Sequence, residues 1–420
     1  DWPVMVVAGP WTWKTQIIAL RTANILQKAQ VNPWNILITT FTEAWVIAIK
    51  KRLWDFLWAN WYKVYVSTIH SFCQDVISTF SEKFLEYKAW TPIDDVDSLE
   101  ILKNILDNLI SEKKLVTLTN DFDKYLYLRD IKSRIWNLKQ EWINVQKLTL
   151  LIKEQSQKYE EELAEIKPTL KKYETTKQTQ EKHILKLQEL ALVYEEYNNF
   201  LRNNSKYDFS DMINFVLEKF RNDEELRYFY AEKFQYIMLD EFQDTNNAQN
   251  EIIDLILSVN QDKPNIMVVW DDDQSIYRFQ WANIENMLDF STKYQDTKVI
   301  VLKNNYRSTQ NILDLCTNLI DNNEQRLSKK IPWLQKVLVS SNPKFNTLTN
   351  SVKFFTPNTL ELEKAYLLQE ITKKIDDWVS KSEIAIIVRS NKEVEDLSYF
   401  FEQNKIDVVS KQNTDILKNE

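Results

Sequence analysis

A single glycine, Gly9, serves the whole 420-residue chain, and it lies in the segment VMVVAGPWTWKT at residues 4–15. Proteins use glycine where the backbone takes a positive φ angle or approaches another group closely. Average usage is about 7%, so a chain of this length would ordinarily hold roughly thirty glycines. Fifteen tryptophans accompany the deficit. Other residues therefore have to occupy turns that normally need glycine.

The segment at residues 4–15 has the form of a strand that leads into a phosphate-binding loop. The apolar run VMVVA is followed by GPWTWKT, which ends in Lys14 and Thr15. Such a loop surrounds phosphate oxygens with backbone N–H groups at a helix N-terminus, and its lysine and hydroxyl contact phosphates and Mg²⁺. Trp11 and Trp13 stand where the loop needs glycine. We expect an indole at position 13 to fill the phosphate space or force the loop open.

The remaining composition is that of a globular chain with two or three domains, since 44% of residues are hydrophobic and 27% are charged. No apolar run approaches the ~20 residues of a membrane span, and residues 1–8 lack the features of a signal peptide. Two cysteines are too few for a disulfide framework, which fits a reducing cytoplasm. The net charge of −8 means that nucleic acid would have to bind through a local groove and stacking.

Apolar runs alternate with amphipathic segments at both ends of the chain, which predicts a doubly wound parallel α/β sheet. The expected strands are residues 4–8, 35–40, 64–69, 236–240, 266–270, 299–302 and 383–388. Between about 95 and 205 the pattern becomes helical. A Lys/Glu-rich stretch from about 145 to 200 predicts a helical hairpin with Pro168 near its turn.

Polar residues follow three of the expected strands, where an α/β sheet places its ligand chemistry. In YIMLDEFQDTNNAQ, Asp240 is suited to hold Mg²⁺ and Glu241 to activate a water molecule. In VVWDDDQSIYRFQWAN, Tyr277 and Phe279 flank a cation and could stack on bases, although core packing is the better explanation of this segment taken by itself. Arg307 of VLKNNYRST could reach a γ-phosphate, but a lone arginine is more often a surface residue.

Seven ordered segments together closely resemble the UvrD/Rep/PcrA family of superfamily 1 DNA helicases. They are AGPWTWKT (8–15), ITTFTEAWVIAIKKRL (38–53), VSTIHSFC (66–73), YDFSDM (207–212), LDEFQDTNNAQ (239–249), WDDDQSIYRFQWAN (270–283) and NNYRST (304–309). The resemblance implies a P-loop NTPase with a RecA-like parallel sheet domain, a helical insert and part of a second RecA-like domain. The implied boundaries are 1–90 with 205–297, then 91–204, then 298–420.

The resemblance also bears on the tryptophans, because the family has glycine at the positions of Trp11, Trp13, Trp270 and Trp281. Trp45, Trp61 and Trp378 also fall where a small or turn-forming residue would be natural. Separate mutations would not place tryptophan at motif glycines this often. Our hypothesis is that the gene uses UGA for glycine and that this sequence renders UGA as tryptophan.

Residue roles follow from the resemblance, position by position. The implied ATP site comprises Ala8, Gly9, Pro10, Trp11, Thr12, Trp13, Lys14, Thr15 and Tyr306, with Mg²⁺ on Thr15 and Asp240. The implied catalytic residues are Glu241 as base, Gln274 as γ-phosphate sensor and Arg307 as finger. The implied DNA-binding residues are Thr40, Phe41, Thr42, His70, Tyr277 and Phe279. Gln280 stands where the family often has arginine, which removes one expected contact.

The implied function is ATP-dependent travel, 3′ to 5′, on single-stranded DNA and at single/double-strand junctions, in repair or replication. Two alternatives stay open. One is the helicase half of an AddA/RecB-like recombination nuclease, and the other is a non-hydrolysing DNA-binding protein, if Trp11 and Trp13 are real. The last two helicase motifs of the family are missing, so the chain is expected to be a fragment and to unwind poorly alone. With only His70 and His183, a zinc cluster or a Ser/His/Asp hydrolase is not expected.

Overall fold

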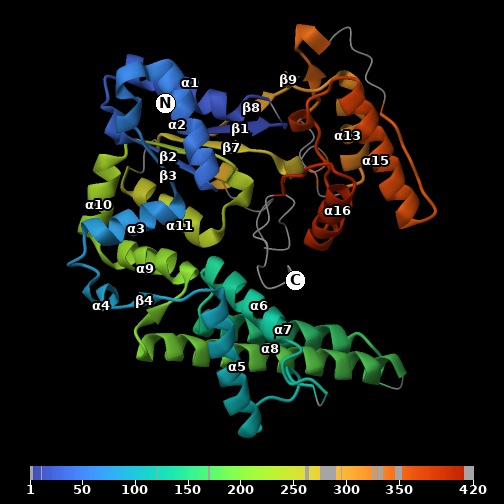
Figure 1. Cartoon of the computed structure of the whole chain (residues 1–420). Coiled ribbons are helices and arrows are strands. Elements are labelled where there is room, and N and C mark those ends of the chain that lie inside the picture. Colours follow the sequence, from blue (N-terminus) through green and yellow to red (C-terminus); the bar gives the residue numbers. More distant parts are fainter. Residues whose placement is uncertain are drawn as a thin grey trace. The chain divides into compact units, whose positions relative to one another are not determined.

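A computed structural model describes residues 3–10, 12–120, 122–168, 171–260, 264–274, 290–294, 296–323, 326, 329, 334–345 and 352–410 (Figure 1). Within it the chain divides into two compact units, residues 1–349 and 350–420. The first unit carries a six-stranded sheet in the order β3-β2-β6-β7-β1-β8. All neighbouring strands in it are parallel, as the alternation of apolar and amphipathic segments predicts.

The strands of the large sheet are β1 (Val4–Ala8), β2 (Ile36–Thr40), β3 (Tyr65–Thr68), β6 (Tyr236–Leu239), β7 (Ile266–Trp270) and β8 (Lys298–Leu302). Short strands form two further pairs, β4 (Thr91–Pro92) with β5 (Lys206–Tyr207), and β9 (Asn304–Asn305) with β10 (Val339–Ser340). The helices of the first unit outside the insert are α1 (Lys14–Lys28), α2 (Glu43–Leu57), α3 (Ile69–Thr79), α4 (Leu85–Lys88), α9 (Phe209–Asn222), α10 (Glu224–Lys233), α11 (Asn247–Leu257) and α13 (Gln310–Ile320).

Successive side chains of each strand point to opposite faces, so the sheet separates two apolar cores. Val6 and Ala8 face one core, which α1 and α2 cover. Met5 and Val7 face the other, which α3, α9, α10 and α11 cover. Figure 1 shows α1 and α2 on one side of the strands and α3, α9 and α11 on the other. The central strands are buried on both faces, and for this reason they read as continuous apolar runs.

The helical insert has a third core of its own. It consists of α5 (Asp95–Ser111), α6 (Leu128–Gln140), α7 (Val145–Ala164) and α8 (Lys171–Asn203). The predicted hairpin is confirmed: α7 and α8 pair, and Pro168 lies between them. The Tyr159 hydroxyl lies 2.8 Å from His183 Nδ1 across the pair, on the exposed side of the hairpin.

Residues 383–388 were expected to form a strand, but residues 384–388 form none. The expectation is wrong for the described chain because a strand needs a neighbour to pair its backbone groups, and the described part of residues 350–420 offers none. That unit consists mainly of α15 (Leu360–Asp376) and α16 (Asn391–Gln403). Residues 298–302 pair with β1 in the large sheet, whereas the proposed domain boundary at 297/298 stays a prediction.

Three tryptophans occupy the left-handed backbone region, where glycine is favoured. Among the described residues, eight that are not glycine have positive φ, and they include Trp13 (67°), Trp142 (52°) and Trp378 (63°). Trp142 and Trp378 each follow the end of a helix, α6 and α15. The next residue's N–H there bonds back to a carbonyl five positions earlier, at 2.8 and 2.9 Å. This is the Schellman arrangement, whose left-handed residue is usually glycine.

The other tryptophans of interest behave differently. Trp45 lies within α2 and Trp61 in the 3₁₀ segment Trp58–Lys63, and neither has positive φ, so their backbone conformation does not require glycine. Trp270 is fully buried at the end of β7, and its indole N–H has no hydrogen-bond partner among the described residues. Trp11 and Trp281 lie outside the described residues. Backbone conformation therefore bears on the glycine hypothesis at Trp13, Trp142 and Trp378.

Candidate nucleotide and nucleic-acid site

The loop between β1 and α1 places Lys14 at the first position of α1. The Thr12 hydroxyl donates to the Gly9 carbonyl at 2.8 Å and closes the turn. Trp13 is the N-cap of α1 and has a left-handed backbone conformation, and no side chain caps the helix there. The first N–H groups of α1 are thus left for another acceptor, which is the arrangement that binds phosphate at helix N-termini.

Lys14 joins residues that lie far apart in the sequence. It is buried, and its Nζ lies 2.8 Å from Glu241 Oε2, 3.4 Å from Gln274 Oε1 and 3.8 Å from Asp271 Oδ2. Glu241 follows β6, whereas Asp271 and Gln274 follow β7. In the sheet, β7 lies between β6 and β1. The three predicted residues Lys14, Glu241 and Gln274 are therefore within contact distance at the carboxyl ends of parallel strands.

Asp240 presents a buried carboxylate oxygen that lacks a partner among the described residues. Its Oδ1 accepts from the Glu241 N–H at 3.0 Å, whereas Oδ2 has no hydrogen bond there. Burial, and then the charge of Glu241, raises the pKa of Asp240 to about 7. Carboxylate oxygen is the ligand that Mg²⁺ prefers, and a divalent cation would relieve the desolvated charge. Asp240 therefore fits a magnesium ligand, with the half-buried Thr15 at the start of α1.

Glu241 is held in a strained conformation at the end of β6. Its φ is 50°, in the left-handed region, which costs a residue with a Cβ roughly 1–2 kcal/mol. Gln243 donates to Glu241 Oε2 at 2.6 Å, and its own oxygen accepts from the Asp271 N–H at 3.0 Å. No role was predicted for Gln243 from the sequence. Its position two residues after the paired acids of LDEFQD is the only signal that could have suggested one.

Three consecutive aspartates follow β7, and two cations neutralise them. The fully buried Lys336 contacts Asp271 at 2.6 Å, Asp272 at 2.8 Å and Asp273 at 3.0 Å. Arg326 adds two contacts to Asp273, at 2.9 and 3.0 Å. Burial alone would lower the pKa of Lys336, but the three carboxylates raise it above its usual value. Carboxylate oxygens of the three aspartates lie close enough to share a cation, yet Lys336 already supplies the positive charge.

Residues from β9 and from the segments next to β9 and β10 contact the phosphate loop. Asn305 Nδ2 donates to the Pro10 carbonyl at 2.8 Å. A Cβ at Gly9 would lie 2.5 Å from a methyl group of Leu338, so a larger residue there would require the Leu338 side chain to shift. The Tyr306 ring packs edge-on against the Trp13 indole, with ring centroids 5.1 Å apart. Arg307 is exposed and begins the turn before α13. The structure thus brings Tyr306 to the loop, and the tryptophan side chain contacts its ring.

The predicted DNA-binding residues lie at the carboxyl ends of two neighbouring strands. Thr40 ends β2 and is buried, and Phe41 follows it with 49% of its side chain exposed. Thr68 of β3 pairs with Thr40, and His70 lies two residues further on. The His70 ring stacks on Phe209, with centroids 4.0 Å apart, and burial lowers its pKa to about 4. Thr42 is partly exposed beside Phe41, while Tyr277 and Phe279 lie outside the described residues.

A parallel α/β sheet with a lysine-ended loop after its first strand and paired acids after a neighbouring strand defines the P-loop NTPase class. Residues 1–295 match the UvrD/REP helicase N-terminal domain, and residues 300–420 match the UvrD-like helicase C-terminal domain. The chain belongs to the UvrD/REP helicase family.

Two relatives are named ATP-dependent DNA helicase PcrA. The protein from Staphylococcus epidermidis (strain ATCC 35984) is 29% identical over 406 residues, which are 96% of this chain and 48% of the relative. The one from Staphylococcus aureus (strain Mu50) is 28% identical over 390 residues, which are 93% of this chain and 46% of the relative. The chain thus spans about half the length of these relatives. No helix in the described residues is both long and apolar enough to cross a membrane.

Proposed function

We propose that the chain is a motor portion of an ATP-dependent DNA helicase or translocase of the UvrD/Rep type. The observation that supports this best is the convergence of Glu241 and Gln274 on Lys14, because these groups come from three separate motifs. The relatives named PcrA are ATP-dependent DNA helicases by name, which agrees with this proposal. Coupling of ATP hydrolysis to travel on single-stranded DNA, 3′ to 5′, in repair or replication is part of the proposal.

In the proposed reaction, Lys14 neutralises β- and γ-phosphate charge, and the N–H groups of the loop from Ala8 to Thr15 hold the phosphate oxygens. Thr15 and Asp240 would hold Mg²⁺, which when bound supplies charge neutralisation at the phosphates. The ammonium of Lys14 is paired with Glu241 at 2.8 Å. Phosphates compete for the same ammonium, so their arrival releases the carboxylate of Glu241 to accept a proton from the attacking water.

A chain of hydrogen bonds connects Lys14, at the proposed γ-phosphate position, with residues that follow β7 and with Glu241. Gln274 contacts Lys14 through its oxygen and donates through its amide nitrogen to Asp271, whose N–H donates to Gln243. Gln243 in turn holds Glu241. In the proposal, Gln274 senses the γ-phosphate through this network, and Arg307 and Tyr306 contribute the finger and the adenine stack from the segment after β8.

Single-stranded DNA is proposed to run along the carboxyl ends of β2 and β3. Phe41 offers an exposed ring, and Thr42 and His70 offer polar groups to the backbone. Because burial holds the pKa of His70 near 4, His70 is neutral at physiological pH and contacts DNA as a hydrogen-bonding and stacking group. Tyr277 and Phe279 complete the proposed platform, and junctions are the proposed substrates. A cytoplasmic location is proposed because Cys73 and Cys316 are both free thiols.

The test is Glu241→Gln in the complete protein, with Lys14→Ala as the comparison. Glu241→Gln should keep nucleotide binding and lose about 10²- to 10⁴-fold of DNA-stimulated ATP turnover, the usual contribution of a general base. Lys14→Ala should lose binding as well, because it removes the charge that holds the phosphates. DNA-stimulated turnover that survives in the Glu241→Gln variant would show that the base is misassigned.

A further inference from the structure

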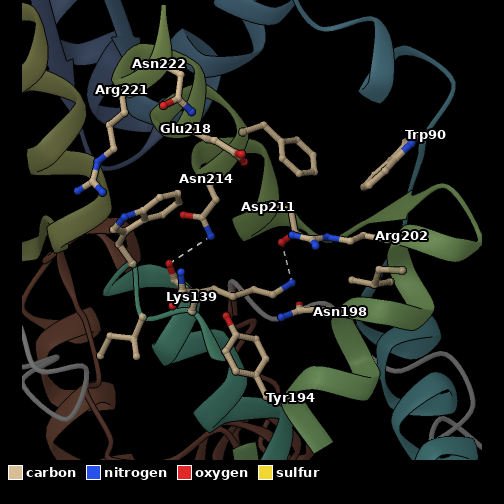
Figure 2. A pocket seen from close by; sticks show the side chains of 15 residues that line it. Trp90, Lys139, Tyr194, Asn198, Arg202, Asp211, Asn214, Glu218, Arg221 and Asn222 are labelled. Atoms are coloured by element: carbon tan, nitrogen blue, oxygen red, sulfur yellow. Dashed lines mark hydrogen bonds and ion pairs between the residues drawn. The ribbon is translucent and has the colours of Figure 1, made fainter. Parts of the chain in front are cut away.

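Lys139, near the end of α6, connects the helical insert to the sheet domain through two carboxylates. Its Nζ lies 2.6 Å from Asp208 Oδ2 and 2.7 Å from Asp211 Oδ1. The ammonium is fully buried, and Tyr197 of α8 also donates to Asp208, at 3.3 Å. Figure 2 shows Lys139 reaching Asp211 while the Lys139 carbonyl accepts from Asn214 of α9. Lys139 and Asp211 line a cavity of about 370 Å³ between α6, α8 and α9.

The two carboxylates divide their oxygens between the lysine and the start of α9. Asp208 is the N-cap of α9, and its Oδ1 accepts from the N–H groups of Ser210 and Asp211 at 3.0 and 3.1 Å. Asp211 Oδ2 accepts from the Asp208 N–H at 3.0 Å, which completes a capping box. The remaining oxygen of each carboxylate faces Lys139. Lys139 therefore fixes the rotamers of the same two side chains that begin α9.

Phe209 lies between Asp208 and Asp211 and belongs to the proposed DNA surface. Phe209 is the first residue of α9, and its ring, 63% exposed, stacks on His70 at 4.0 Å. His70 belongs to the first turn of α3, directly after β3. A displacement of the N-terminus of α9 would move Phe209 and alter the stack that orients His70. The insert is otherwise joined to the sheet domain by the short pair β4 and β5 and by packing of α6 on α9 and α11.

We propose that Lys139 is a positioning residue that couples the helical insert to the single-strand surface. It sets the start of α9 through Asp208 and Asp211, and it thereby holds the stacked pair of Phe209 and His70 in place. This inference rests on the proposed function for its DNA readout, while its structural part stands without it. A substrate that moves the insert would thus change the position of His70 through Asp208, Asp211 and Phe209. The ATP loop would not have to change.

The first test is hydrogen–deuterium exchange of the 420-residue chain and two variants. Lys139→Met should speed exchange at residues 208–214 and at residues 69–73. Lys124→Met is the matched control, because Lys124 pairs with Asp107 at 2.6 Å in the same insert but is 53% exposed. Exchange at both segments should stay unchanged in the control. If Lys139→Met leaves residues 69–73 as protected as in the parent chain, the inference is overturned.

The second test measures binding of an oligothymidylate by fluorescence anisotropy. Lys139→Met should weaken it by about fivefold or more, the lower range of a lost base–aromatic stack. The triple variant Lys139→Met, Asp208→Asn, Asp211→Asn removes the buried charges and keeps asparagine as a helix cap. It should recover stability but not DNA affinity, and recovery of both would refute a positioning role. If the parent chain does not bind the oligonucleotide, the proposed function fails, and the exchange comparison still decides the structural part.

Discussion

Replacing Trp378 by glycine should stabilise the protein, although it removes the largest side chain there is. Trp378 has a φ of 63° and is 96% exposed, so it combines a strained backbone with almost no burial. The left-handed conformation costs a residue with a Cβ roughly 1–2 kcal/mol. Glycine removes this cost, but its more flexible unfolded chain lowers the free energy of unfolding by about 0.5–1 kcal/mol. We therefore expect Trp378→Gly to raise the free energy of unfolding by about 0.5–1 kcal/mol.

The assay is urea unfolding followed by far-ultraviolet circular dichroism, with two matched variants. Lys405→Gly has the same geometry after α16, with a φ of 60° and a 3.0 Å bond from the Ile406 N–H to the Phe401 carbonyl, and should also stabilise. Trp54→Gly lies inside α2 with 57% exposure and should destabilise by about 0.5 kcal/mol, the difference in helix propensity. If Trp378→Gly destabilised the chain as Trp54→Gly does, the strain argument would be wrong.

Three further predictions concern the buried charges and the tryptophans. The pKa of Asp240 is about 7 in the folded chain and near 4 in the unfolded chain, so its contribution to stability is present below about pH 4 and is lost as the pH rises to about 7. Asp240→Asn should therefore raise the free energy of unfolding of the unliganded chain by up to about 4 kcal/mol at pH 8 and change it little at pH 3. Urea titrations at the two pH values measure the difference. Lys336→Met should cost about 3–5 kcal/mol of unfolding free energy because it strands buried carboxylates, whereas Lys177→Met, at an exposed 4.0 Å pair, should cost at most about 0.5 kcal/mol. Mass spectrometry of the protein from its native source should find glycine at positions 13, 142 and 378, and a peptide with tryptophan at position 13 would reject the recoding hypothesis.

Local sequence patterns predicted the elements whose conformation follows from their own residues. The runs at residues 4–8 and 266–270 are apolar throughout, because both faces of a central parallel strand are buried, and both form strands. Pro168 cannot continue a helix, and it lies between α7 and α8 as expected. Residues 384–388 have the same apolar character and form no strand, because pairing depends on a partner that local sequence does not reveal.

The candidate site divides in the same way. The contacts of Lys14 with Glu241 and Gln274 could be anticipated, because residues at the carboxyl ends of neighbouring parallel strands meet at one edge. Lys336 could not, because it lies in a segment without a motif and reaches the aspartates only through the tertiary fold. The left-handed conformation of Trp142 could not be anticipated either, because this residue follows a helix end outside the seven motif segments. Long-range electrostatic partners and backbone conformations are thus the features that needed the structure.

The central claim is that the loop before α1 binds nucleoside triphosphate once glycine replaces its tryptophans. Isothermal titration calorimetry with ATP and Mg²⁺ tests it on three chains: the sequence as written, Trp11→Gly with Trp13→Gly, and the latter with Lys14→Ala. The double-glycine chain should bind at least about tenfold more tightly than the sequence as written, a gain of about 1.4 kcal/mol, and Lys14→Ala should abolish the gain. Equal affinity in the first two chains, or binding that survives Lys14→Ala, would contradict the account.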